Sequence, residues 1–126
     1  MKSFFISIAF FILILTGIVS YQVILEKKAD EINSITLEIQ QSAELSDKDR
    51  YAEATEKLSK NFEEVKNWLM AFEDHEQILE MAQCIQELKG YKERIDESVV
   101  MIGLNKFRYL LNYSVESVKP TLENIL

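Results

Sequence analysis

The sequence predicts an all-α protein in which an N-terminal transmembrane helix continues into an antiparallel bundle of about four helices. The 126 residues include only three glycines and one proline, so turns are few and helices are long. The chain opens with a long uncharged apolar run. After it, apolar residues recur every three or four positions, without the period-two alternation that is typical of a strand.

The apolar run from Ser3 to Leu25 contains no charged residue over 23 positions. About 20 helical residues cross the roughly 30 Å hydrocarbon layer of a bilayer. We therefore expect residues 1–25 to form a transmembrane signal anchor in the lipid bilayer, and residues 26–126 to form an acidic helical-bundle domain. A secretory signal cleaved after Ser20 is an alternative, but its apolar region would be unusually long.

Basic residues flank both ends of the anchor, with Lys2 on one side and Lys27 and Lys28 on the other. Their counts nearly balance, so they set the orientation only weakly. The two-residue tail before the apolar run resembles that of a signal anchor whose N-terminus stays in the cytoplasm. This interpretation predicts a single-pass protein of the cell membrane with an extracytoplasmic C-terminal domain.

One helix is expected to run without a break from Ser3 to Glu44, because no helix breaker separates the anchor from the apolar stripe beyond it. That stripe comprises Leu25, Ala29, Ile32, Ile35, Ile39 and Ala43. The polar residues 45–49 then interrupt the pattern, and Ser46, followed by Asp49, predicts the N-cap of a second helix. The apolar stripe of the second helix comprises Tyr51, Ala54, Leu58, Phe62, Val65, Leu69 and Phe72.

Two more caps predict two more helices. Asp74 and Gln77 have the spacing of a capping box, and the third helix is expected to end near Gly90. Asp96 offers a cap for a fourth helix that Pro120 should stop, with the tail 121–126 tucked back. Their stripes comprise Ile78, Met81, Ala82, Ile85 and Leu88, and then Val99 or Val100, Leu104, Phe107, Leu110 or Leu111, and Tyr113.

Four amphipathic helices joined by short polar links favour an up-down bundle. A layer of two helical hairpins and an elongated coiled coil are the alternatives. After the anchor, 13 basic side chains stand against 21 acidic ones, a net charge of −8. Such a surface repels phosphate backbones, so nucleic acid is not an expected partner.

No residue pattern indicates catalysis, a cofactor or a metal. His75 is the only histidine and lacks the second histidine, four residues on, that a zinc-binding helix needs. Cys84 is the only cysteine and lies beside the third apolar stripe, where a thiol behaves as a small hydrophobe. We therefore expect a non-enzymatic protein.

Trp68 and Phe72 lie four residues apart with Leu69 between them, which makes the apolar stripe wide enough for part of it to face a partner. His75 follows within an acidic stretch. Trp68, Phe72 and His75 are therefore the candidate partner-binding residues. Core packing is expected to account for most of the other aromatic side chains, which include Tyr91, Phe107, Tyr109 and Tyr113.

The order of several short motifs resembles that of a known family. These motifs are the uncleaved leader, the acidic helix from Tyr51 to Trp68, the block from Trp68 to Ile78, the spacing to Leu88 and Tyr91, and the closing residues 122–126. Together they resemble the domain of unknown function (DUF) 4363 family of small single-span membrane proteins of Gram-positive bacteria. The resemblance implies a membrane-associated protein that works beside a multi-pass membrane partner, and it supplies no activity.

Two hypotheses of function remain from the sequence. The first is a non-enzymatic interaction or accessory module for another membrane or envelope protein. The alternative is an extracytoplasmic ligand-binding or sensing bundle, which would need a polar-lined cavity. A homo-oligomer is compatible with either hypothesis.

Overall fold

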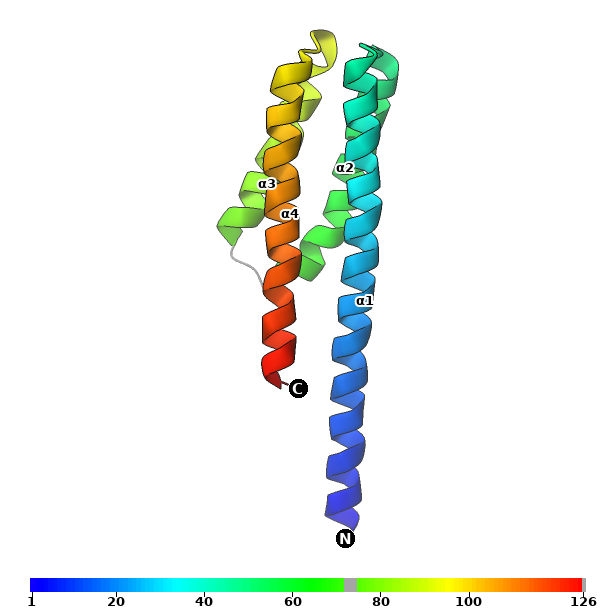
Figure 1. Cartoon of the computed structure of the whole chain (residues 1–126). Helices are drawn as coiled ribbons and strands as arrows, with labels where there is room; N and C mark the ends of the chain where they lie inside the picture. Colours follow the sequence, from blue (N-terminus) through cyan, green and yellow to red (C-terminus); the bar gives the residue numbers. More distant parts are fainter. Residues whose placement is uncertain (72–74, 126) are drawn as a thin grey trace.

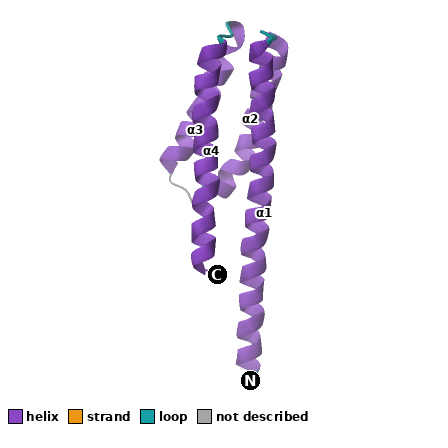
Figure 2. Ribbon diagram, viewed as in Figure 1, coloured by secondary structure: helices purple, strands orange, loops and turns teal. Residues whose placement is uncertain are grey.

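The computed structural model describes residues 1–71 and 75–125 of the chain. In these ranges the elements are α1 (Lys2–Glu44), α2 (Lys48–Leu69), α3 (His75–Gly90), the short 3₁₀ helix η1 (Tyr91–Glu93) and α4 (Glu97–Ile125). Helices alone make up the regular structure of the described residues, as Figure 2 shows. The predicted all-α fold is confirmed.

The first helix, α1, has two different halves. Its 43 residues span about 65 Å at 1.5 Å per residue, and its N-terminal end projects beyond the other helices (Figure 1). Among the helices of the described ranges, α1 is the one that is long and apolar enough to cross a membrane. From Leu25 onward it buries a stripe inside the bundle, and all six predicted stripe residues are buried.

The turn between α1 and α2 corrects one prediction. Ser46 has a φ of 52°, its N–H donates to the carbonyl of Ala43, and the N–H of Asp47 donates to the carbonyl of Ser42. These two bonds form a Schellman motif, so Ser46 closes α1 and does not cap α2. Asp47 caps α2, and its carboxylate accepts a hydrogen bond from the N–H of Arg50 at 3.1 Å.

The end of α4 corrects two further predictions, which concern Pro120 and the tail that follows it. Pro120 does not stop the helix, and residues 121–125 continue it, so this part of the predicted tail does not tuck back. A proline inside a helix removes one N–H donor and strains one turn, and the hydrogen bonds on either side allow the helix to continue. The start agrees with the sequence, because the Asp96 carboxylate accepts a hydrogen bond from the N–H of Ser98 at 3.0 Å.

The four long helices form an up-down bundle that closes on itself. Each of α2, α3 and α4 packs against the helix before it, and α4 also packs against α1. This last contact excludes an open layer of two hairpins and an elongated coiled coil. Lys28 pairs with Glu64 at 3.0 Å, and Arg50 donates to Gln41 at 3.2 Å, which fixes the antiparallel register of α1 and α2.

One hydrophobic core runs along the bundle axis. The predicted stripes are buried in all four helices, except that Ala82 is only partly buried and Tyr113 is exposed. Where the sequence left a choice, Val100 is buried and Val99 is partly buried, while Leu110 and Leu111 are both buried. Two of the predicted positions lie outside the described residues: Phe72 at the end of the α2 stripe and Asp74, the predicted cap of α3.

Contacts at the centre of the core tie helices together in pairs. The rings of Phe62 and Phe107 meet edge to face at 6.2 Å, which joins α2 to α4. The buried hydroxyl of Tyr51 donates to the carbonyl of Leu88 at 2.5 Å, and burial raises the pKa of this phenol. Gly103 lets α4 approach α3 closely, because a Cβ there would lie 3.2 Å from a methyl group of Leu88.

The Schellman turn leads to a stability prediction. Ser46→Gly should raise the free energy of unfolding by about 0.5–1 kcal/mol, because glycine adopts a positive φ without the steric cost of a side chain. Ser59→Gly, inside α2, should lower the free energy of unfolding by about 0.5 kcal/mol, because glycine is a poorer helix former than serine. Urea unfolding of the full chain in mild detergent measures both, and a destabilised Ser46→Gly variant would contradict this account of the turn.

Candidate functional site

The candidate site is the end of the bundle where α2 ends and α3 begins, which we call the base. At the base α1 emerges from the bundle toward its apolar N-terminal half (Figure 1). Trp68 and His75, two of the three residues predicted to bind a partner, lie here, since α2 ends at Leu69 and α3 begins at His75. The third, Phe72, lies outside the described residues.

Trp68 is half-buried against α1. Its ring lies 5.1 Å from the ring of Tyr21, measured between centroids, at an interplanar angle of 49°. The hydroxyl of Tyr21 donates a hydrogen bond to the main-chain carbonyl of Trp68. This pair therefore fixes the end of α2 to the apolar part of α1, while His75 is exposed at the start of α3.

A second candidate surface, which the sequence reasoning missed, lies on the outer face of α4. Ile102, Tyr109 and Tyr113 are 70%, 69% and 48% exposed, and the rings of the two tyrosines stack at 6.3 Å. The core was expected to take Tyr113, but that position lies two residues beyond Leu111 and so points away from the buried stripe. Spacings of seven and four residues along one helix were the signal for this face.

Arg108 ties α4 to α1 through polar groups. Its Nε donates to the hydroxyl of Thr36 and a terminal nitrogen donates to the amide oxygen of Gln40, both at 3.0 Å. Burial lowers the pKa of Arg108, although guanidinium stays charged across the physiological range. The hydroxyl of Thr36 also donates to the carbonyl of Asn33 at 2.7 Å, which orients it toward the arginine.

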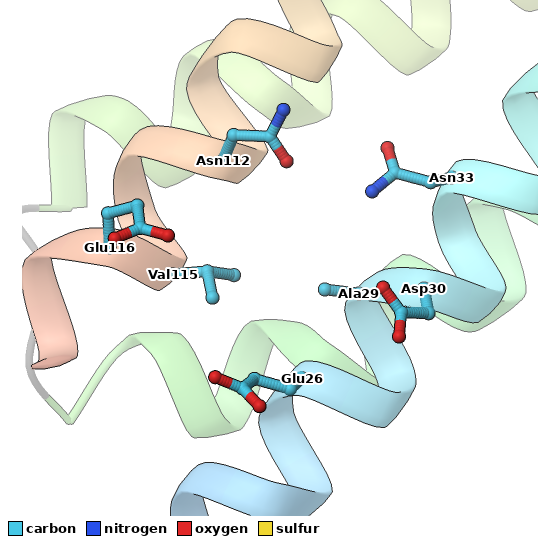
Figure 3. Close-up of a pocket in the computed structure, with 7 residues that line it drawn as sticks. All are labelled: Glu26, Ala29, Asp30, Asn33, Asn112, Val115 and Glu116. Atoms are coloured by element: carbon cyan, nitrogen blue, oxygen red, sulfur yellow. The ribbon is translucent and has the colours of Figure 1, made fainter.

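Between Arg108 and the base, α1 and α4 leave an open groove of about 340 Å³. Figure 3 shows Asn33 on α1 and Asn112 on α4 pointing toward each other across it. The complete lining is Glu26, Ala29, Asp30, Asn33, Asn112, Val115 and Glu116. The groove is therefore polar and acidic, with a small apolar floor.

Neither metal chemistry nor thiol chemistry has an evident centre in the described part of the chain. Residues 1–71 and 75–125 contain no group of three or more histidine, cysteine or carboxylate side chains placed to hold a metal ion. Cys84 is buried in the core, as predicted, and burial raises the pKa of its thiol. A raised pKa keeps the thiol protonated and poorly nucleophilic.

Comparisons with known proteins do not extend this description. No protein-family model, no curated protein and no solved structure matches the chain. The resemblance to the DUF4363 family therefore stays a prediction.

The Arg108 contacts generate a second prediction. Arg108→Met should lower the free energy of unfolding by about 1–2 kcal/mol, because Gln40 and Thr36 both lose a charged donor. Lys106→Met removes a cation from an exposed position two residues away and should change the free energy of unfolding by less than about 0.5 kcal/mol. Urea unfolding in mild detergent measures the free energy of unfolding of both variants. Equal changes in the two variants would show that the hydrogen bonds from Arg108 to Thr36 and Gln40 contribute nothing to stability.

Proposed function

We propose that this chain is a single-pass, membrane-anchored helical module that works without catalysis by binding another membrane or envelope protein. The observation that carries the proposal is the structure of α1, in which one unbroken helix has a largely exposed apolar N-terminal part and a part packed into the bundle. An uncovered apolar helix of this length is stable in hydrocarbon and unstable in water.

The contact surface that we assign to the partner is the exposed α4 face of Ile102, Tyr109 and Tyr113. Tyrosine is enriched at protein interfaces because its ring supplies apolar area while its hydroxyl keeps a polar contact. The face lies on the bundle and outside the anchor, so it remains available when α1 is in the bilayer. Trp68 and His75 at the base extend this contact toward the membrane.

A photocrosslinking experiment in native membranes tests this surface. Benzoylphenylalanine in place of Tyr109 should yield one discrete adduct on illumination. Adding Ile102→Ser, which removes exposed apolar area without touching the core, should lower the adduct yield by about fivefold. The measurement is the adduct fraction on a gel, followed by mass spectrometry of the partner.

Benzoylphenylalanine in place of Lys60, which is exposed on α2, is the matched control and should give no discrete adduct. An adduct of twice the mass of the chain would show that the surface binds a second copy of the protein, which contradicts the proposed partner. Equal yields from the Tyr109 and Lys60 positions, or none from Tyr109, would contradict an interaction surface on α4.

We further propose that the bundle lies outside the cytoplasm, with the N-terminus inside. The single native cysteine makes this testable, because Cys84→Ser gives a background free of thiols. In that background, Leu45→Cys places a thiol at the exposed far end of α1 and should react with a membrane-impermeant maleimide in intact cells. A cysteine inserted between Met1 and Lys2, outside the apolar run, should react only after the membrane is permeabilised. The reverse pattern would place the bundle in the cytoplasm.

The groove between α1 and α4 favours a second candidate function, a bundle that binds or senses a small ligand. Its acidic lining suits a small cationic ligand. The groove is open, and the buried core beside it is apolar. We therefore rank ligand sensing below protein binding.

A further inference from the structure

The bundle reaches further along α1 than the boundary between apolar and charged residues. Ile18 and Tyr21, both inside the uncharged run, pack against the bundle core, and Trp68 of α2 lies on Tyr21. After Lys2 at its start, the next charged residue of α1 is Glu26. The last two turns of the apolar run therefore lie level with the base.

The opposite face of α1 at this same level is apolar and uncovered. Val19, Val23 and Ile24 are 52%, 58% and 38% exposed. The bundle occupies the other side of the helix, so it cannot cover them. If lipid covers these side chains, then lipid and the base of the bundle contact opposite sides of the same turns of α1.

The length of α1 below the bundle supports the same conclusion. Among the described residues, the first of α1 that packs against the core is Ile18, and the 16 residues from Lys2 to Gly17 before it measure about 24 Å along the helix axis. The hydrocarbon layer is about 30 Å thick. A bilayer that the anchor spans must therefore reach up to the base.

The fourth helix continues past this level. Val115 and Glu116 line the groove opposite Ala29 and Glu26. The backbone of α4 then continues to Ile125, about 14 Å further toward the N-terminal end of α1, as Figure 1 shows. The base thus extends beside the apolar part of the anchor.

We infer that the base of the bundle is seated in the headgroup layer of the bilayer, with Trp68 and Tyr21 at the boundary between headgroups and hydrocarbon. The bundle is therefore docked on the lipid surface and is not raised on a stalk. Tryptophan and tyrosine favour this boundary because their rings are apolar and their N–H and O–H groups are polar. The inference rests on the proposed anchoring of α1.

The lipid surface that fits is zwitterionic. Acidic side chains line the groove beside the base, namely Glu26, Asp30 and Glu116, whereas Glu64 is paired with Lys28. Anionic headgroups would meet repulsion from this side of the bundle. Phosphatidylcholine vesicles are therefore a sufficient partner for a test.

Trp68 is the only tryptophan of the chain, so its fluorescence reports the position of the base directly. The full chain is reconstituted into phosphatidylcholine vesicles that carry bromine atoms either near the headgroup end of the acyl chains or near their methyl ends. Trp68 emission should be quenched about twofold more by the bromines near the headgroups, because the indole favours the interface. Iodide in the aqueous phase should quench it weakly.

Two variants calibrate the depth in the same vesicles. Trp68→Phe/Phe11→Trp moves the tryptophan to the middle of the anchor and should be quenched most by the bromines near the methyl ends. Trp68→Phe/Leu45→Trp moves it to the far end of the bundle and should be quenched by iodide alone. Phe11 and Leu45 are both exposed, so neither change disturbs the core.

The outcomes separate the two proposals. Lipid quenching at position 11 without lipid quenching of Trp68 would overturn the docked base and leave the anchor intact. Absence of lipid quenching at position 11 would overturn the anchor and the docked base together. Lipid quenching at position 45 would show that the whole bundle lies against the membrane, which also overturns the inference.

Discussion

The continuity of α1 is the constraint on which the rest of the structure depends. One helix supplies both the uncovered apolar half and a full side of the bundle, with Leu25 and Ala29 already inside the core. A helix holds its direction through its backbone hydrogen bonds, so the bundle cannot rotate freely about a linker. Any fixed orientation of the anchor in a membrane therefore fixes the orientation of the other three helices.

The two sides of α1 within the bundle are packed by different interactions. Toward α2, two cross-helix ion pairs flank the apolar stripe on the surface, where such pairs contribute little. Toward α4, Arg108 bridges the helices at one level, and a polar groove opens nearer the base. The α1–α4 contact is therefore more polar where it approaches the apolar half of α1.

The described surface presents three features suited to association. Cys84 is buried, and the described residues contain no group of three or more histidine, cysteine or carboxylate side chains placed to hold a metal ion. The features that remain are the tyrosine face of α4, the Tyr21–Trp68 pair and the groove. Each suits association with lipid, protein or a small cation.

The sequence by itself determined the helices and most of the core, because helical spacing of apolar residues is a local property that survives folding. It could not separate Ser46 from Asp47 as a cap, since that choice depends on how α1 closes. Only the tertiary structure decided that α4 returns to α1, that Tyr109 and Tyr113 stay exposed, and that Trp68 rests on Tyr21. These contacts join positions distant in the chain, and no local pattern specifies which helices become neighbours.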